Sequence, residues 1–333
     1  MLKNGSQESA RSSTFLLMRE ALLPLKIPDQ NKYITMKELP MILDPIVPSP
    51  LDYRDYRAKF TGVAPDFVDL KPDVVEVEDQ QQYGSCTANA GCSALELMYH
   101  RGIHVKYDFS RMYVYFYSRE AANIAGDAGA FPRDLCKILA KKGTCHESTW
   151  PYSAENISNR PSDAADQEAE SFRIAKYEQV TFDIDQMKLS VANGVPILTT
   201  VKVHKTFMGL NSARDWRDTD EICSYWDPSG EITGYHEVLI IGYDEKQQVF
   251  LAQNSWGPSF GDGGFFGIPF GYVNDVISEM WVITSIFNVP IPIPDKQRAP
   301  IFLKKTLDKI KIGAIILAFA AVSAYQLIFH PMT

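Results

Sequence analysis

The sequence is poor in cysteine and lacks the cysteine spacings that hold small domains together. Its 333 residues contain five cysteines, Cys86, Cys92, Cys136, Cys145 and Cys223. That number is too small for a disulfide scaffold of this length, and it leaves at least one thiol free if the others pair. No C-x-x-C pair occurs, so the usual signature of structural zinc is missing. The remaining question is whether one thiol is reactive or all are buried as small apolar side chains.

Positive charge is also scarce. Lys and Arg total 33 against 41 Asp and Glu, a net charge of −8. Because nucleic-acid binding depends on Lys and Arg against phosphate, we expect no nucleic-acid partner. The hydrophobic share of 45% and the charged share of 22% are ordinary for a globular protein. They exclude a disordered chain, a collagen-like fibre and a multi-span membrane protein.

The two ends of the sequence differ in their hydrophobic runs. Near the N-terminus the apolar run Phe15–Met18 is too short for a signal peptide, which needs about 7–15 apolar residues. By contrast, the 18 residues of Ile312–Phe329 carry no charge, four lysines precede them within 304–311, and four residues follow. This length lies at the short end of the range of about 17–25 for a membrane-spanning helix.

The pattern of this second run predicts a single-pass tail anchor. Every face of the segment 312–329 is apolar or small, which favours a transmembrane helix over a core helix. Because basic flanks stay cytoplasmic, we expect the body of the protein to face the cytosol. The alternative is a hydrophobic tail that packs on the protein or mediates oligomers without entering lipid.

Between these ends the pattern predicts an α+β body. Helical sequence comes first and β-branched and aromatic runs come later, which is typical of α+β proteins rather than doubly wound sheets. Helices are expected at Thr87–His100, Arg111–Ala122 and Arg133–Lys142, and strands at Val195–Val203, Glu237–Tyr243, Val249–Gln253 and Glu279–Phe287. We divide the chain into an N-terminal extension (1–65), the body (66–288), a Pro- and Lys-containing linker (289–311) and the transmembrane segment (312–329).

One cysteine stands where a helix is expected to begin. Cys86 follows Gly84 and Ser85 and precedes helix-forming sequence. The unpaired backbone N–H groups and the dipole at a helix N-terminus favour a thiolate, which is the nucleophilic form of cysteine. This local feature alone is equally compatible with a buried structural cysteine.

A histidine and an asparagine accompany two of the expected strands. His236 opens the apolar run in GYHEVLIIGY, and Asn254 ends the next run, 18 positions later, in NSWG. Two strands joined by a turn at 244–248 could bring Asn254 beside His236. An amide that bonds one imidazole nitrogen fixes the tautomer and aims the other nitrogen at a thiol.

Together these motifs resemble the papain-like cysteine peptidases. The matching segments are QYGSCTANA, Ser110-Arg111, GTCHESTWPY (143–152), the strand with His236, NSWG, and GGFFGIPFGYV (263–273). They look most like the bacterial and viral branch, and they extend from about Asp66 to Phe287. The order Cys, His, Asn is that of the family, and the separation of 150 between Cys86 and His236 fits its spacing of about 130–150. The resemblance implies a two-lobed fold, one lobe helical and one antiparallel β.

The resemblance also implies a role for each residue. Cys86 is expected to be the nucleophile of peptide-bond hydrolysis, His236 the general base and later acid, and Asn254 the residue that orients His236. Gln80, six positions before Cys86, is expected to form the oxyanion hole with the Cys86 N–H, although Gln81 and Gln82 leave its register open. The expected substrate-binding residues are Gly129 and Ala130 and, shielding the His–Asn contact, Trp256. No metal or organic cofactor is expected.

Three departures from the family pattern keep other interpretations open. Thr87 stands where a tryptophan usually follows the nucleophile, and Tyr83 stands where many secreted members have a disulfide cysteine. The long signature helix of papain-type propeptides is not visible in residues 1–65, so an inhibitory prosegment is unsupported there. The alternatives are a catalytically silent papain-like scaffold, or an enzyme that transfers the acyl group to an amine other than water.

Overall fold

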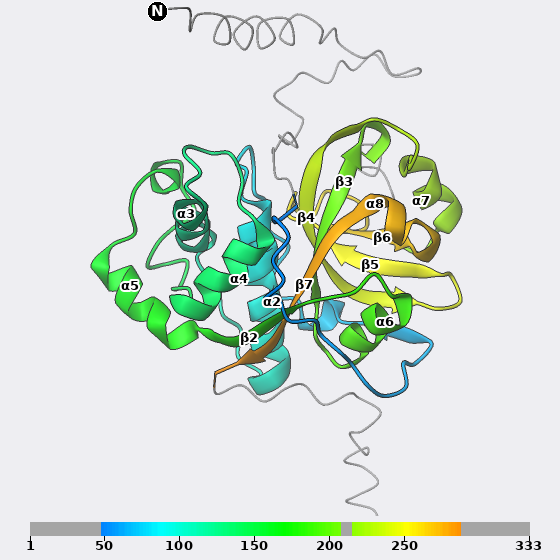
Figure 1. Cartoon of the computed structure of the whole chain (residues 1–333), viewed down its shortest axis with the longest axis horizontal. Coiled ribbons are helices and arrows are strands. Elements are labelled where there is room, and N and C mark those ends of the chain that lie inside the picture. Colours follow the sequence, from blue (N-terminus) through cyan, green and yellow to red (C-terminus); the bar gives the residue numbers. More distant parts are fainter. Residues whose placement is uncertain (1–47, 208–214, 288–333) are drawn as a thin grey trace, which may run out of the picture.

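The computed structural model describes residues 48–207 and 215–287, which form two lobes (Figure 1). One lobe contains α2 to α5, and the other is built on a sheet of β-strands. Most of the expected N-terminal extension, the linker 289–311 and the segment 312–329 lie outside the described residues. Within 48–207 and 215–287, no helix is both long and apolar enough to cross a membrane.

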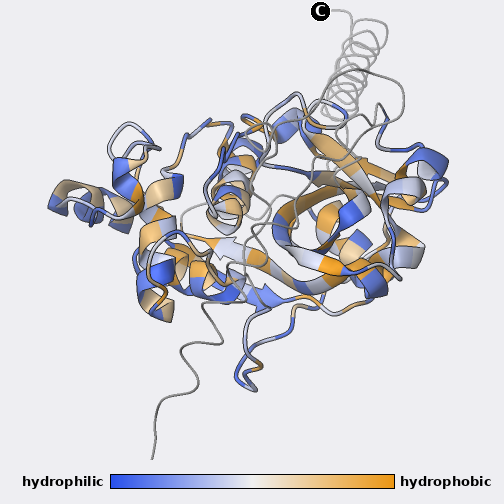
Figure 2. Cartoon of the chain, turned by 90° about the horizontal axis from the view of Figure 1, so that it is seen from above, coloured by the Kyte–Doolittle hydropathy of each residue, from blue (hydrophilic) through white to orange (hydrophobic). Residues whose placement is uncertain are grey.

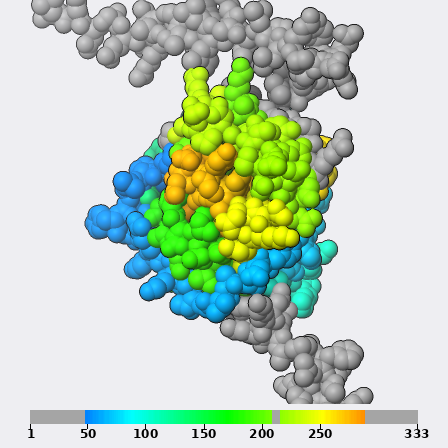
Figure 3. Space-filling view, turned by 90° about the vertical axis from the view of Figure 1, so that its right-hand side faces the viewer, coloured from blue at the N-terminus to red at the C-terminus, as the bar shows by residue number. Residues whose placement is uncertain are grey.

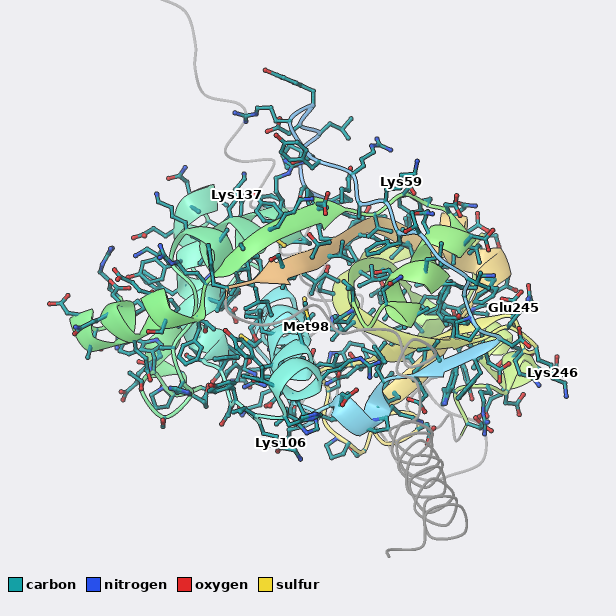
Figure 4. The ribbon with its side chains drawn as sticks, turned by 90° about the horizontal axis from the view of Figure 1, so that it is seen from below. Lys59, Met98, Lys106, Lys137, Glu245 and Lys246 are labelled. Carbon is teal, nitrogen blue, oxygen red and sulfur yellow. The ribbon has the colours of Figure 1, made fainter. Side chains whose placement is uncertain are left out.

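The central helix of the molecule is α2, Cys86–Ile103, and its first 14 residues are all buried. Small side chains let its neighbours approach closely. At Gly91 an added Cβ would lie 2.6 Å from Cδ2 of Leu135 on α4, Pro132–Lys141, so a larger residue would displace the Leu135 side chain. Figure 4 shows Met98 of α2 in the middle of the molecule. The expected helix at Thr87–His100 is thus confirmed, slightly lengthened at both ends.

The rest of the helical lobe packs around α2. The helix α3, Arg111–Ala122, begins where the Ser110 hydroxyl accepts a hydrogen bond from the Tyr113 N–H at 3.1 Å, a standard N-cap. Pro132 at the first turn of α4 supplies a fixed φ that suits a helix start. The helix α5, Asp163–Ala169, is capped in the same way by Ser162. Short 3₁₀ turns at Glu155–Ile157 and Glu170–Phe172 complete this lobe.

The second lobe is an antiparallel sheet with the strand order β2-β7-β3-β4-β5-β6, and β1 pairs with β4. Short helices α6 (Ile184–Ala192), α7 (Thr219–Tyr225) and α8 (Val273–Val276) connect its strands. The strands are β1 Phe67–Asp69, β2 Ile174–Gln179, β3 Ile197–His204, β4 Ile232–Asp244, β5 Val249–Gln253, β6 Phe265–Pro269 and β7 Ile277–Ile286. Antiparallel β structure after a helical half confirms the expected α+β class.

Two strands begin earlier than the sequence predicted. The strand β4 starts at Ile232 rather than Glu237, so His236 lies inside the strand and not at its start. Likewise β7 starts at Ile277 rather than Glu279. The reason is non-local: Val201 and His204 of β3 pair with His236 and Ile232, and this pairing extends β4 through residues without a clear apolar pattern.

Apolar residues from distant parts of the sequence form the core. Figure 2 shows hydrophobic residues along the strands of the sheet and mixed hydrophobic and hydrophilic residues on the helices. Figure 3 shows that segments coloured from blue to orange, and thus far apart in the chain, lie side by side on one face of the β lobe. The largest fully buried side chains include Trp281, Tyr113 and Phe266. Burial of this extent is the main source of stability for such a fold.

Residues 48–58 lie against both lobes. The Ser49 N–H donates to Glu279 of β7 at 2.6 Å, and Asp55 forms an ion pair with Arg133 of α4 at 2.6 Å. The Ala58 N–H donates to the carbonyl of Gln179 at the end of β2. This part of the expected N-terminal extension is therefore bonded to the body of the protein.

Candidate active site

Cys86 is the first residue of α2, and the turn before it is held from several sides. The Gly84 N–H donates to Asp127 at 2.9 Å, and the Ser85 hydroxyl lies 2.5 Å from the Tyr152 hydroxyl. The Asn89 amide, one turn into the helix, donates to the Ser85 carbonyl at 3.0 Å. The thiol therefore stands at a fixed helix N-terminus, where the helix dipole favours negative charge.

The other thiols lie in surroundings that suppress their reactivity. All five cysteines are free thiols. Burial raises the pKa of Cys92 and Cys136 well above the usual value, and it raises the pKa of Cys145 to about 12. Cys223 is only partly buried, in the short helix α7. Because the thiolate is the nucleophile, the three buried thiols other than Cys86 are poor candidates for catalysis.

His236 and Asn254 are brought together by the hairpin of β4 and β5. His236 Nε2 lies 2.7 Å from Asn254 Oδ1, as the sequence predicted. The same Oδ1 accepts the Ser255 N–H at 2.9 Å, so the atom facing the imidazole is an acceptor. It follows that Nε2 carries the proton and that Nδ1 is the nitrogen able to take one.

This pair is almost completely enclosed. His236 and Asn254 are each 2% exposed, and the Trp256 ring covers the imidazole with 4.6 Å between ring centroids. Burial lowers the pKa of His236 to about 4, while the hydrogen bond that His236 donates to Asn254 acts in the opposite direction. Trp256 thus lies where the sequence analysis placed it, over the histidine and asparagine.

Of the three adjacent glutamines, Gln80 is the one that lies inside the site. Its side chain is buried, and its Nε2 donates to the Tyr83 carbonyl at 2.9 Å. Gln81 and Gln82 are exposed. An amide nitrogen has two hydrogens, so one N–H of Gln80 can still donate to a bound group.

Ser255 was not singled out from the sequence, yet it positions Gln80. Its hydroxyl donates to Gln80 Oε1 at 2.6 Å, and its carbonyl accepts the Gln80 N–H at 2.8 Å. These bonds join the segment before Cys86 to the segment after Asn254, and an isolated bridge between Asp79 and Trp256 reinforces them. A serine in a turn has many ordinary roles. Its place beside Asn254 was therefore the one signal in the sequence that could have identified it.

Gly129 and Ala130 lie beside the start of α2. The hydroxyl of Thr87, directly after Cys86, donates to the Ala130 carbonyl at 2.9 Å. Gly129 has a φ of +83°, a conformation that glycine adopts without strain, and its N–H donates to the Tyr115 hydroxyl at 3.1 Å. Thr87 therefore ties this segment to the nucleophile turn.

Two other groups of polar residues do not belong to this site. The His146 imidazole is bonded to Glu168 in the helical lobe, and His100 lies 3.5 Å from Asp73. Across residues 48–207 and 215–287, no cluster of three His, Cys, Asp or Glu could hold a metal ion.

Sequence comparisons identify the family. Residues 64–284 match the family model described as papain family cysteine protease. An uncharacterised peptidase C1-like protein of Acanthamoeba polyphaga mimivirus is 30% identical over 228 residues, which cover 65% of this chain and 71% of that protein. A cathepsin B-like protein of Giardia intestinalis, CP3, is 26% identical, with 79% of this chain and 88% of that protein covered.

A solved structure shares both fold and sequence with the chain. Xylellain, a cysteine protease from Xylella fastidiosa, superimposes with a TM-score of 0.66 and is 29% identical, covering 76% of this chain and 99% of that one. The family model itself spans about two thirds of the sequence and includes all the residues of the site described above. The chain therefore belongs to the papain family of cysteine proteases and is a cysteine peptidase, a hydrolase of peptide bonds.

Proposed function

We propose that Cys86, His236, Asn254 and Gln80 are the catalytic residues of this peptidase. The observation that carries the proposal is the 2.7 Å bond between His236 Nε2 and Asn254 Oδ1, enclosed under Trp256. That bond leaves Nδ1 as the proton-accepting nitrogen. The segment that leads to Cys86 is hydrogen-bonded to the residues that follow Asn254, which supports a single site formed by both lobes.

The mechanism follows from these roles. The Cys86 sulfur attacks the carbonyl carbon of the peptide, and the negative charge that develops on its oxygen is bound by the Cys86 N–H and the second N–H of Gln80 Nε2. The protonated His236 gives its proton to the leaving amine as the C–N bond breaks, which leaves an acyl-enzyme. His236 then removes a proton from water, the hydroxide attacks the thioester, and the acid departs as the thiol re-forms.

At rest we propose a Cys86 thiolate paired with a His236 imidazolium. Burial by itself favours the neutral imidazole, because it lowers the His236 pKa. A thiolate within reach opposes this effect, since a nearby opposite charge favours the charged form of a titratable group. The helix N-terminus stabilises the other partner, the thiolate.

Two further proposals concern the substrate-binding residues and the branch of the papain family to which the chain belongs. Gly129 and Ala130 are proposed to bind the substrate backbone, supported by the bond from Thr87 that holds them beside the nucleophile turn. Trp256 would line the same site while covering the His–Asn pair. The similarity to proteins from a mimivirus and from Xylella fastidiosa supports a place in the bacterial and viral branch of the family.

We also propose that residues 312–329 anchor the peptidase to a membrane, with the catalytic body on the cytosolic side. The support is the sequence itself, which has 18 uncharged residues preceded by four lysines. The five free thiols are in keeping with a reducing compartment.

Substitution of the nucleophile tests the proposed function. Cys86→Ala should abolish cleavage of a peptide library followed by mass spectrometry, whereas Cys223→Ala, the matched control, should leave it intact. Reaction with a thiol-directed epoxide peptide should label wild-type protein at Cys86. Full activity in Cys86→Ala would overturn the proposal, and failure to label or cleave would favour a silent scaffold. Products with an added amine instead of water would indicate acyl transfer.

A further inference from the structure

The turn that carries the nucleophile is connected to the Gly129–Ala130 segment on both sides of Cys86. Before Cys86, the Gly84 N–H donates to Asp127 Oδ1 at 2.9 Å. After it, the Thr87 hydroxyl donates to the Ala130 carbonyl at 2.9 Å. The segment 127–130 therefore spans the nucleophile turn from one flank to the other.

A fully buried tyrosine completes the connection. The Tyr115 hydroxyl donates to the same Asp127 Oδ1 at 2.6 Å and accepts the Gly129 N–H at 3.1 Å. Asp127 thus holds the backbone of Gly84 directly and the backbone of Gly129 through Tyr115. Although Asp127 lies at the surface, this one oxygen joins the two segments on the side of Gly84, opposite the bond between Thr87 and Ala130.

The tyrosine itself is fixed in place. The Arg119 guanidinium, one turn further along α3, stacks on the Tyr115 ring at 4.1 Å from its centroid. Arg119 also donates to the carbonyl of Gly126, the residue before Asp127. Tyr115 and Arg119 both belong to α3. Their bonds to Asp127 and Gly126 therefore attach the loop that contains Asp127 to this helix.

From this geometry we propose that Asp127 and Tyr115 are positioning residues, which keep Gly129 and Ala130 in register with Cys86 so that a peptide is presented to the thiol. Their proposed action is through the backbone of the segments that they hold, with no step of the chemistry assigned to them. No disulfide joins these segments, since all five cysteines are free, and hydrogen bonds to the Asp127 carboxylate and to the Ala130 carbonyl join them instead. The inference rests on the proposed roles of Cys86 and of Gly129 and Ala130.

The test separates binding of the peptide from reactivity of the thiol. Asp127→Ala and Tyr115→Phe should each lower kcat/KM for a fluorogenic peptide by about tenfold or more, mainly through KM, because displacement of about 1 Å at a positioning element can cost up to 10²-fold. The rate of alkylation by iodoacetamide, which is too small to use Gly129 and Ala130, should change by less than about threefold. Asp127→Asn keeps an oxygen that can accept both bonds and should restore kcat/KM to within about threefold of wild type.

Glu120→Ala is the matched control, because Glu120 is a carboxylate of α3 bonded to the exposed Arg160. It should leave both rates at the wild-type level. Wild-type kcat/KM in Tyr115→Phe would overturn the proposal, and so would a parallel fall of alkylation and cleavage that Asp127→Asn does not rescue. If Asp127→Ala does not fold, Tyr115→Phe and Asp127→Asn decide alone. Activity of Cys86→Ala would instead refute the proposed function, and it is measured on the same substrate.

Discussion

At the scale of single residues, hydrogen bonds fix the orientation of the side-chain amides of Asn254 and Gln80. The site depends on this orientation as well as on the residue types. Asn254 offers its oxygen to His236 because the Ser255 N–H binds the same atom, and this excludes the flipped amide. Gln80 offers its nitrogen because the Ser255 hydroxyl and the Tyr83 carbonyl take up the remaining positions. A substitution that removes the bonds orienting either amide should therefore lower the rate of peptide cleavage more than it lowers the stability of the fold.

The oxyanion assignment gives a first prediction. Gln80→Ala should reduce kcat by about 10²-fold, the usual effect of removing one oxyanion donor, and Ser255→Ala should have a smaller effect because it only loosens the orientation of Gln80. The control variants Gln81→Ala and Gln82→Ala remove exposed side chains and should behave like wild type. Steady-state kinetics on one peptide substrate checks all four. A mild effect at Gln80 together with a severe one at Gln81 or Gln82 would place the oxyanion donor elsewhere.

The burial of His236 gives a second prediction, which concerns pH. In Cys86→Ala the imidazole has no thiolate beside it, and its folded pKa of about 4 lies below the ordinary 6.5. The unfolded chain then binds the proton first as pH falls, so the stability from the neutral imidazole is complete above pH 6.5 and declines toward pH 4. The loss over this range should be up to about 3 kcal/mol in the free energy of unfolding.

Denaturant titrations at several pH values measure this loss, and two comparisons interpret it. The double variant Cys86→Ala/His236→Ala lacks the imidazole and should show only the shallow dependence of the other groups. Wild type should lose less than Cys86→Ala between pH 6.5 and 4, because a thiolate raises the His236 pKa in the folded state. Equal losses in wild type and Cys86→Ala would argue against the resting ion pair.

At the scale of elements, the start of α3 is joined to α2 by a buried ion pair. The Arg111 guanidinium lies 3.0 Å from Glu96 of α2 and 2.6 Å from Glu78, and both Arg111 and Glu96 are almost fully buried. Glu96 also accepts the Phe109 N–H at 2.8 Å, in the loop that leads to α3. These contacts set the position of α3, and with it the position of Tyr115 beside the nucleophile turn.

We therefore expect Arg111→Ala to destabilise the fold by about 3–5 kcal/mol, since it leaves a buried carboxylate without its partner. Urea denaturation followed by circular dichroism measures the change. Arg160→Ala is the control, because Arg160 pairs with Glu120 at the surface and should leave the midpoint unchanged. If Arg111→Ala unfolds at the wild-type urea concentration, the ion pair does not determine the arrangement of α2 and α3.

At the scale of the whole molecule, the described body carries the proposed catalytic site, and the proposed anchor lies beyond it in the sequence. None of the helices within 48–207 and 215–287 could cross a membrane. The proposed attachment rests on the sequence of residues 312–329. In cells that express the full chain, the protein should remain in the membrane pellet after alkaline carbonate extraction. A variant truncated after residue 311 should move to the supernatant.

Protease protection on sealed vesicles then reports orientation. The body should be digested from the outside, because the lysines before residue 312 favour the cytosolic side. Release of the full chain by carbonate would contradict the anchor. A body that is protected from protease and glycosylated at Asn156, within the acceptor sequence N-I-S, would reverse the orientation.

The sequence by itself determined the α+β class and the three principal helices, and it predicted which residues form the candidate site. This was possible because helix periodicity is local and because the segments with Cys86, His236 and Asn254 each carry a distinctive short motif in the family order. The 18-residue separation of His236 and Asn254 was enough to predict a hairpin contact, which the structure contains. The same local information also placed Cys86 correctly at a helix N-terminus.

Only the tertiary structure decided the features that depend on pairing between distant segments. It extended β4 back to Ile232 through its register with β3, and it distinguished the buried Gln80 from its two exposed neighbours. It also revealed the hydrogen bond from Ser255 to Gln80 and the hydrogen bond between Tyr115 and Asp127 beside the turn that carries Cys86. Serine, tyrosine and aspartate have many ordinary positions in a sequence, so their roles become visible only when the fold brings a donor and an acceptor within about 3 Å.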